Sequence, residues 1–156
     1  MAGLSGDSGK TIVWPALLLE ASRRNLPVGA FKKGPACIDA AWLEWASGQP
    51  ARNLDTHSMG FDRVAASFAS HATAHGLNAI EGNRGLNDGL DAGGPHGTGL
   101  ATALRAPVAL AIGAAKVTRT VAALVLGCQS CHNYAAVTLA CWDCHRESKT
   151  IVGSAR

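Results

Sequence analysis

The chain is poor in aromatic residues and in charge. Aromatic residues make up 5% of its 156 residues, and its formal net charge is +3. So small and dispersed a charge excludes a nucleic-acid-binding surface, and no apolar run reaches the roughly 18 residues that a membrane span needs. Apolar residues still make up 47% of the chain, which argues against disorder. The composition predicts one domain whose core is built from small and aliphatic side chains.

A good export signal is also missing. Lys10 precedes an apolar stretch over 12–19, but this stretch is short, is interrupted by Pro15 and is followed by Glu20, where a signal peptide would have a small-residue cleavage site. The chain is therefore expected in the cytoplasm, where thiols stay reduced. Its five cysteines are an odd number, which argues against a secreted disulfide framework and leaves metal, haem or chance.

Predicted strands alternate with predicted helices. Strands are expected at 28–31, 77–80, 107–112 and 136–140. Helices are expected up to about residue 24, from a cap at Asp39 to Gly48, and at about 62–75, 98–104 and 117–126. The segment 82–97 is a long loop rich in Gly, Asn and Asp. This alternation predicts an α/β fold with a mostly parallel sheet between helix layers.

A glycine-rich segment, residues 3–11, ends in Gly9-Lys10-Thr11 just before the first predicted helix. These residue types suit a phosphate-binding loop, because glycines let backbone N–H groups face the phosphates, lysine reaches the terminal phosphates and a hydroxyl binds Mg²⁺. Leu4 stands where the strict pattern has glycine, so a plain glycine-rich tail is the alternative. Because only two residues precede Gly3, the strand that should carry the loop is expected to be missing.

Four further strings occur in one order along the chain. They are Phe31-Lys32-Lys33-Gly34-Pro35, Ile38-Asp39, Asn53-Leu54-Asp55 and Glu81-Gly82-Asn83-Arg84-Gly85-Leu86-Asn87-Asp88-Gly89-Leu90-Asp91. Over about residues 3–127 the chain resembles the amino-terminal half of the cobyrinic acid a,c-diamide synthase family, which includes sirohaem-amidating relatives. The resemblance implies an ATP-binding domain of P-loop NTPase type at 1–127, with three layers. This domain would lack its first strand and its C-terminal part, and a divergent cysteine-rich tail would follow at 128–156.

The resemblance also implies an activity, the ATP-dependent amidation of tetrapyrrole side-chain carboxylates in cobalamin or sirohaem modification. ATP would activate the carboxylate as an acyl phosphate, and ammonia from a glutaminase domain or subunit would then displace phosphate. A glutaminase domain is not recognisable in this chain, and a homodimer is a further expectation. Phosphoryl transfer to a carboxylate brings anions together, so lysines and a metal ion are needed to neutralise the charge.

The resemblance assigns roles to seven residues of this chain. ATP would be bound by Gly9, Lys10 and Thr11. Catalysis would depend on Lys32 and Asp39. The Mg²⁺ ligands would be Thr11, Asp55 and Glu81. Taken singly, these residues have plainer explanations, such as a solvated lysine, a helix cap, a turn residue and a strand-end carboxylate; their joint order favours the functional interpretation.

This chain also departs from the family pattern. Ala36 and Cys37 stand where an acidic residue and an aromatic residue are usual, and Gly113 stands where the family tends to have Asp. An inactive fragment is therefore an alternative to an active enzyme.

Two CxxCH units stand close together near the end of the sequence. They are formed by Cys128, Cys131 and His132, and by Cys141, Cys144 and His145. Such a unit is typical of c-type haem attachment, whereas four thiols at this spacing suit one Zn²⁺. A metal- or haem-binding electron-transfer module is thus the alternative function, and a chance pattern is the third interpretation.

Overall fold

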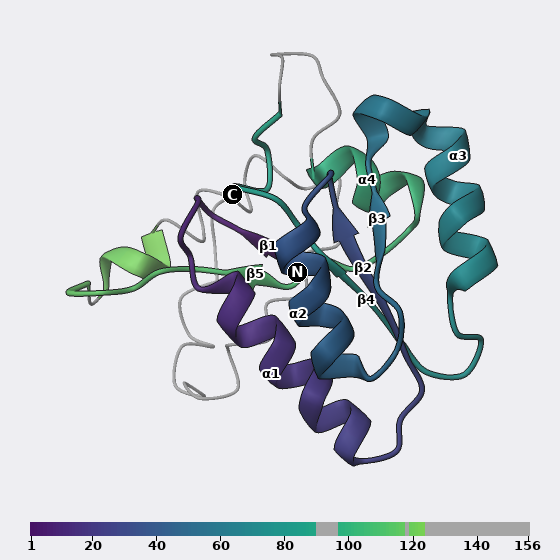
Figure 1. Ribbon diagram of the computed structural model, residues 1–156. Helices are drawn as coiled ribbons and strands as arrows, with labels where there is room; N and C mark the ends of the chain where they lie inside the picture. Colours follow the sequence, from purple (N-terminus) through teal and green to yellow (C-terminus); the bar gives the residue numbers. More distant parts are fainter. Residues whose placement is uncertain (90–96, 118, 124–156) are drawn as a thin grey trace, which may run out of the picture.

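The computed structural model describes residues 1–89, 97–117 and 119–123, and its fold belongs to the α/β class. Helices and strands alternate along the chain and every paired strand is parallel, as the sequence predicted (Figure 1). The cysteine pairs, the predicted strand at 136–140 and the end of the helix at 117–126 lie outside the described residues; of that helix, 120–123 are helical. In the described part of the chain, no helix is long and apolar enough to cross a membrane.

The strands form two parallel groups that backbone hydrogen bonds join. β2 (Val28–Lys33) lies between β3 (Arg52–Leu54) and β4 (Leu77–Glu81), while β1 (Ala2–Gly3) pairs with β5 (Leu110–Ala111). The N–H of Gly82 donates to the carbonyl of Met1 at 2.7 Å, and the N–H of Leu86 donates to that of Gly3 at 2.8 Å. These bonds place β1 beside the carboxyl end of β4, so the strand order is β3-β2-β4-β1-β5.

The expectation that no strand precedes the glycine-rich loop was wrong. Ala2 and Gly3 form a two-residue strand, because the N–H groups of Ala2 and Leu4 donate to the carbonyls of Ala109 (2.8 Å) and Ala111 (3.1 Å). Two residues are enough to form this strand, because β4 and β5 flank it on both sides. The strand predicted at 107–112 is correspondingly short, and its two paired residues are half-buried rather than fully enclosed.

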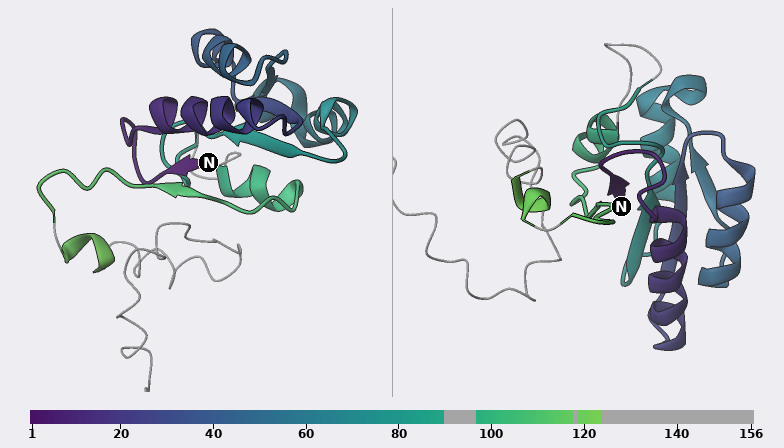
Figure 2. Two further views of the ribbon diagram at one scale, coloured as in Figure 1. Left: turned by 90° about the horizontal axis from the view of Figure 1, so that it is seen from below. Right: turned by 90° about the vertical axis from the view of Figure 1, so that its left-hand side faces the viewer.

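Helices cover both faces of the sheet. α1 (Lys10–Arg23) and α2 (Cys37–Ser47) pack side by side on one face, whereas α3 (Thr56–His71) and α4 (Gly97–Ala103) pack on the other (Figures 1 and 2). Successive side chains of β2 point to opposite faces of the sheet and so pack against both helix layers. Ala30 lies in the core under α1 and α2, while Phe31 packs with Val64 of α3 and Leu100 of α4. A strand buried on both faces is typical of parallel sheets.

The cap of α2 and the start of α3 differ from the sequence prediction. Asp39 does not cap α2; the cap position is Ala36, and Asp39 lies in the first turn of the helix. Gly48 ends α2 in the left-handed conformation, at φ 67°, as predicted. α3 begins at Thr56 rather than near residue 62, because Asp55 caps it, and a kink at Gly60 divides it.

Candidate functional site

The glycine-rich loop connects the end of β1 to the start of α1. Gly9 takes the left-handed conformation, at φ 79°, and α1 begins at the next residue, Lys10. Within the loop the Ser8 hydroxyl donates to the carbonyl of Ser5 at 2.6 Å. The first turn of α1 therefore opens toward the loop, an arrangement that favours anions because helix N-terminal N–H groups are unpaired.

Lys10 is held inside this loop. Its Nζ donates to the carbonyl of Ser5 at 3.1 Å, and the residue is only 6% exposed. The space it occupies depends on Gly3, since a Cβ there would lie 2.5 Å from Lys10 Nζ and 2.6 Å from the Ser5 carbonyl oxygen. Burial, followed by the nearby charge of Lys32, lowers the pKa of Lys10. The negative charge of a phosphate group at the loop would oppose this lowering of the Lys10 pKa.

Thr11 and Glu81 meet at the end of β4. The Thr11 hydroxyl donates to Glu81 Oε1 at 2.9 Å, although the two residues are 70 positions apart. Glu81 is completely buried, and its second oxygen, Oε2, has no hydrogen-bond partner among the described residues. An unpaired buried carboxylate oxygen is costly. Together with a hydroxyl group, it offers the hard oxygen ligands that Mg²⁺ prefers.

Lys32, on β2 between β3 and β4, connects this pair to α2. Its Nζ lies 2.7 Å from Asp39 Oδ2 and 3.6 Å from Glu81 Oε1, and it donates to the carbonyl of Gly82 at 3.3 Å. Lys32 is 2% exposed, so it is not a solvated surface lysine. The parallel register of β2 and β4 explains the contact between Lys32 and Glu81, because these two residues pair directly across the sheet.

Asp55 is placed differently from the other predicted residues. Its carboxylate accepts from the backbone N–H of His57 and from the Ser58 hydroxyl, and so caps α3. The bond from Ser58 lowers the pKa of Asp55. Lys33 lies close enough for its charge to interact with Asp55, while burial lowers the pKa of Lys33. Hydrogen bonds and ion pairs thus join Thr11, Glu81, Lys32 and Asp39, whereas Asp55 contacts the first turn of α3.

Sequence reasoning passed over three residues at this edge of the sheet. Asn53 pairs in register with Lys32, and its Oδ1 is buried without a hydrogen-bond partner in the described part of the chain. Asp88 Oδ2 accepts from the N–H of Gly85 at 2.8 Å, and a Cβ on Gly85 would lie 3.0 Å from the Leu4 carbonyl oxygen. All three belong to strings that carry the family resemblance. Their place in those strings was the sequence signal that could have identified them as site residues.

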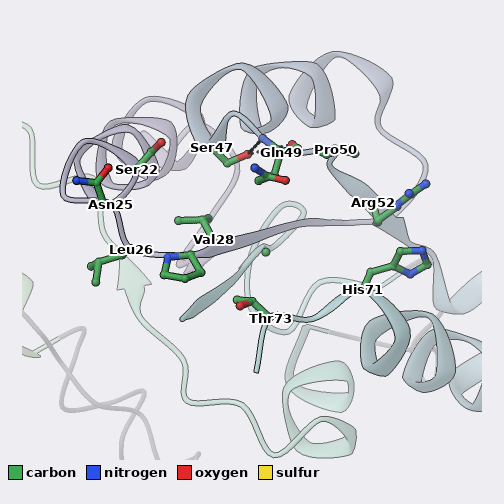
Figure 3. A pocket seen from close by; sticks show the side chains of 12 residues that line it. Ser22, Asn25, Leu26, Val28, Ser47, Gln49, Pro50, Arg52, His71 and Thr73 are labelled. Carbon is green, nitrogen blue, oxygen red and sulfur yellow. Dashed lines mark hydrogen bonds between the residues drawn. The ribbon is translucent and has the colours of Figure 1, made fainter. Parts of the chain in front are cut away.

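A groove of about 550 Å³ lies at the opposite edge of the sheet (Figure 3). It is lined by Val28 and Arg52, at the amino ends of β2 and β3, and by residues of the connecting turns. Ligands of open α/β sheets bind at the carboxyl ends of the strands. Lys10, Thr11, Lys32 and Glu81 all lie at that other edge, so we take the carboxyl edge as the candidate site.

The fold and this edge define a parallel α/β domain with a glycine-rich loop and two buried lysines. Its sequence is similar to particular enzymes. It is 45% identical over 122 residues to cobyrinate a,c-diamide synthase of Magnetococcus marinus, covering 78% of this chain and 26% of that protein. It is 38% identical over 129 residues to the synthase of the same name from Syntrophotalea carbinolica, covering 81% of this chain and 28% of that one.

A third relative is named for a different substrate, hydrogenobyrinate. Over 129 residues the chain is 37% identical to hydrogenobyrinate a,c-diamide synthase of Streptomyces coelicolor, covering 81% of this chain and 26% of that protein. No family model matches the chain. These similarities confirm the resemblance to the cobyrinic acid a,c-diamide synthase family. The chain spans between about a quarter and a third of the length of these relatives.

Proposed function

We propose that this chain is the nucleotide-binding part of an ATP-dependent enzyme that converts tetrapyrrole side-chain carboxylates into amides. The observation that carries the proposal is the contact network at the carboxyl edge of the sheet: Thr11 bonds Glu81, and Lys32 lies between Glu81 and Asp39. Similarity to synthases of this name supports the choice of reaction. The site combines buried cations and a glycine-rich loop, which phosphoryl transfer requires.

Each residue of the network has a task in this proposal. Lys10 and the loop around Gly9 bind the phosphates of ATP. Lys32 faces the phosphoryl group as it is transferred, and Asp39 holds the Lys32 ammonium group in place through their 2.7 Å contact. Thr11 and Glu81 fit a Mg²⁺ site because one Glu81 oxygen is unpaired, and Asp55 would approach from the end of β3. When bound, Mg²⁺ neutralises charge on the phosphates.

Two bond exchanges make up the proposed reaction. A substrate carboxylate oxygen forms a bond to the terminal phosphorus of ATP, and ADP leaves. Ammonia then forms a bond to the acyl carbon, phosphate leaves, and ammonia loses a proton. Ammonia would come from a glutaminase domain or subunit that hydrolyses glutamine. A corrinoid carboxylate is the preferred substrate class, with a sirohaem carboxylate as the alternative, and the cytoplasm is the proposed compartment.

Nucleotide binding tests this proposal directly. Replacing Lys10 with alanine removes the cation inside the loop, so binding of ATP with Mg²⁺ should weaken by roughly tenfold or more, as expected for a charged hydrogen bond worth about 1.5–3 kcal/mol. Isothermal titration calorimetry measures the difference. Arg63→Ala, which removes a cation from the exposed side of α3, is the matched control. Equal affinity in the Lys10→Ala variant and the parent chain would contradict the proposal.

A further inference from the structure

The groove at the amino edge of the sheet lies apart from the proposed nucleotide site. Its volume of about 550 Å³ falls within the range of small-molecule binding sites (Figure 3). The buried residues Val28 and Gly29, at the start of β2, form part of its lining. Polar residues from the ends of α1, α2 and α3 and from the segments that follow them line the rest, among them Ser22, Ser47 and Thr73. A mixed apolar and polar lining is typical of a pocket that binds a small organic molecule.

The charge along this groove has one sign. Among the described residues that line it, Arg52 and His71 can carry a positive charge and none is acidic. The Arg52 side chain is exposed, and its guanidinium forms no hydrogen bond or ion pair with the described part of the chain. Glu44 is close by on α2, but its Oε2 accepts from the backbone N–H of Ala51 at 3.3 Å. The free guanidinium therefore offers paired N–H donors, which suit a carboxylate or a phosphate.

His71, the last residue of α3, adds a second donor at the same end of the groove. Its Nδ1 lies 2.8 Å from the carbonyl oxygen of Ser67. Because a carbonyl oxygen can only accept, Nδ1 carries a proton and Nε2 remains for a ligand. The protonated ring donates through Nε2 as well, and a positive charge is favoured at the C-terminal end of a helix. Figure 3 shows His71 and Arg52 together at one end of the groove, away from Ser22 and Asn25.

Neutral hydrogen-bonding groups line the remainder of the groove. The Ser22 hydroxyl and the side-chain amides of Asn25 and Gln49 have no hydrogen-bond partner within the described ranges. Thr73 is held by its backbone, since its N–H donates to Asn78 Oδ1 and its carbonyl accepts from Asn78 Nδ2, both at 2.8 Å. The Thr73 hydroxyl is left for other contacts. These groups can bind the hydroxyl or amide groups of a ligand, but none of them supplies a charge.

We propose that this groove binds a small organic anion. The carboxylate or phosphate group of the ligand contacts Arg52 and His71, and its hydroxyl or amide groups contact Thr73 and the polar residues at the other end of the groove. β2 runs from Val28 at the groove to Lys32 at the nucleotide edge. Because the two sites lie at opposite ends of this strand, the anion and a nucleotide can be bound at the same time.

Calorimetric titration of the full 156-residue chain without Mg²⁺ tests the site. Citrate and glycerol 3-phosphate are the probes: the first carries carboxylates, the second a phosphate, and both carry hydroxyl groups. At least one should bind saturably, and the comparison shows which anionic group the groove prefers. Arg52→Gln should weaken binding by roughly tenfold or more, since it removes a charged bidentate donor. Arg63→Gln makes the same change on the exposed side of α3 and should leave the affinity unchanged.

Two further measurements separate the groove from the glycine-rich loop, which could also attract anions. Lys10→Ala should leave binding of the probe intact, whereas Arg52→Gln should leave binding of ATP with Mg²⁺ intact, so this proposal and the proposed function fail independently. In NMR spectra the probe should shift the imidazole resonances of His71 but not those of His57, at the other end of α3.

Three results would each overturn the proposal. The first is that neither probe binds to the parent chain. The second is that Arg52→Gln binds the probe as tightly as the parent. The third is that Lys10→Ala abolishes binding, which would place the anion at the loop.

Discussion

Two glycines near the start of the chain, Gly3 at the end of β1 and Gly6 in the loop that follows, differ sharply in what surrounds them. Around Gly3, three atoms lie within 3 Å of the position that a Cβ would take, including the carbonyl oxygen of Ser5. Around Gly6, no atom lies within 4 Å of that position. Since a loop that holds Lys10 needs close backbone approach, Gly3 is required by its neighbours, whereas Gly6 is not.

This contrast makes a prediction in which the same substitution is compared at two positions. Gly3→Ala forces the Ser5 carbonyl and Lys10 Nζ apart, so it should destabilise the chain by about 1–3 kcal/mol, the usual cost of overpacking, and should weaken ATP binding. Gly6→Ala should change neither quantity appreciably. Urea unfolding and calorimetric titration measure the two effects, and equal behaviour of the two variants would contradict the packing described for the loop.

Lys32 and the neighbouring Lys33 differ in how deeply they are buried. Lys32 is 2% exposed and contacts Asp39 and Glu81, whereas Lys33 points to the other face of the sheet and is only half-buried. Adjacent residues of a strand alternate between faces, so the string Lys32-Lys33 divides its charges between two layers. The order of residues alone does not show which lysine meets the carboxylates.

Among the elements, α3 shows how a single side chain fixes a boundary. Sequence periodicity places the start near residue 62, but the Asp55 carboxylate pairs with the backbone N–H of His57 and begins the helix at Thr56. Gly60, at φ 75°, interrupts the helical pattern inside this first part. The periodicity of apolar residues does not detect the first turn of α3, because the Asp55 cap stabilises this turn and the kink at Gly60 separates it from the rest of the helix.

The cap gives a pH-dependent prediction for α3. The Ser58 hydroxyl lowers the pKa of Asp55, so the ionised carboxylate stabilises the folded chain above the unfolded-state pKa of about 3.9. That contribution is lost as the pH falls through the lower folded-state pKa. At pH 7, Asp55→Ala should therefore cost about 1 kcal/mol of unfolding free energy, and the cost should shrink in acid.

Asp55→Asn is the control for this effect, because it keeps an acceptor for the helix N-terminus but cannot titrate. Its stability relative to Asp55→Ala should show no such pH dependence. Denaturant unfolding at neutral and acidic pH measures all three chains. A cost of Asp55→Ala that is the same at every pH would show that the ionised cap does not stabilise α3.

At the scale of the whole molecule, the proposed nucleotide site joins segments that lie far apart in the sequence. β1 and α1 come from the start of the chain, Lys32 from β2, and Glu81 from the end of β4. A ligand that contacts all of them binds the folded chain and not the unfolded one, so it stabilises the fold by mass action. ATP with Mg²⁺ at about one hundred times its dissociation constant should add about 2.7 kcal/mol.

Thermal unfolding tests this coupling. The melting temperature of the parent chain should rise with the concentration of ATP and Mg²⁺, and the Lys10→Ala variant should show a much smaller rise. AMP with Mg²⁺, which lacks the terminal phosphates that Lys10 would contact, serves as the ligand control. A melting temperature that does not respond to ATP would contradict a nucleotide site at this edge.

The sequence by itself determined the α/β class, the main helices and strands, and the residue strings that carry the family resemblance. These properties depend on local chemistry: Gly48 ends α2, and the apolar run of β2 suits a strand buried on both faces. Only the tertiary structure decided that Ala2-Gly3 is a strand, that Asp39 binds Lys32 rather than capping its helix, and that Thr11 meets Glu81. Those contacts depend on strand register and on segments far apart in sequence, which no local pattern encodes.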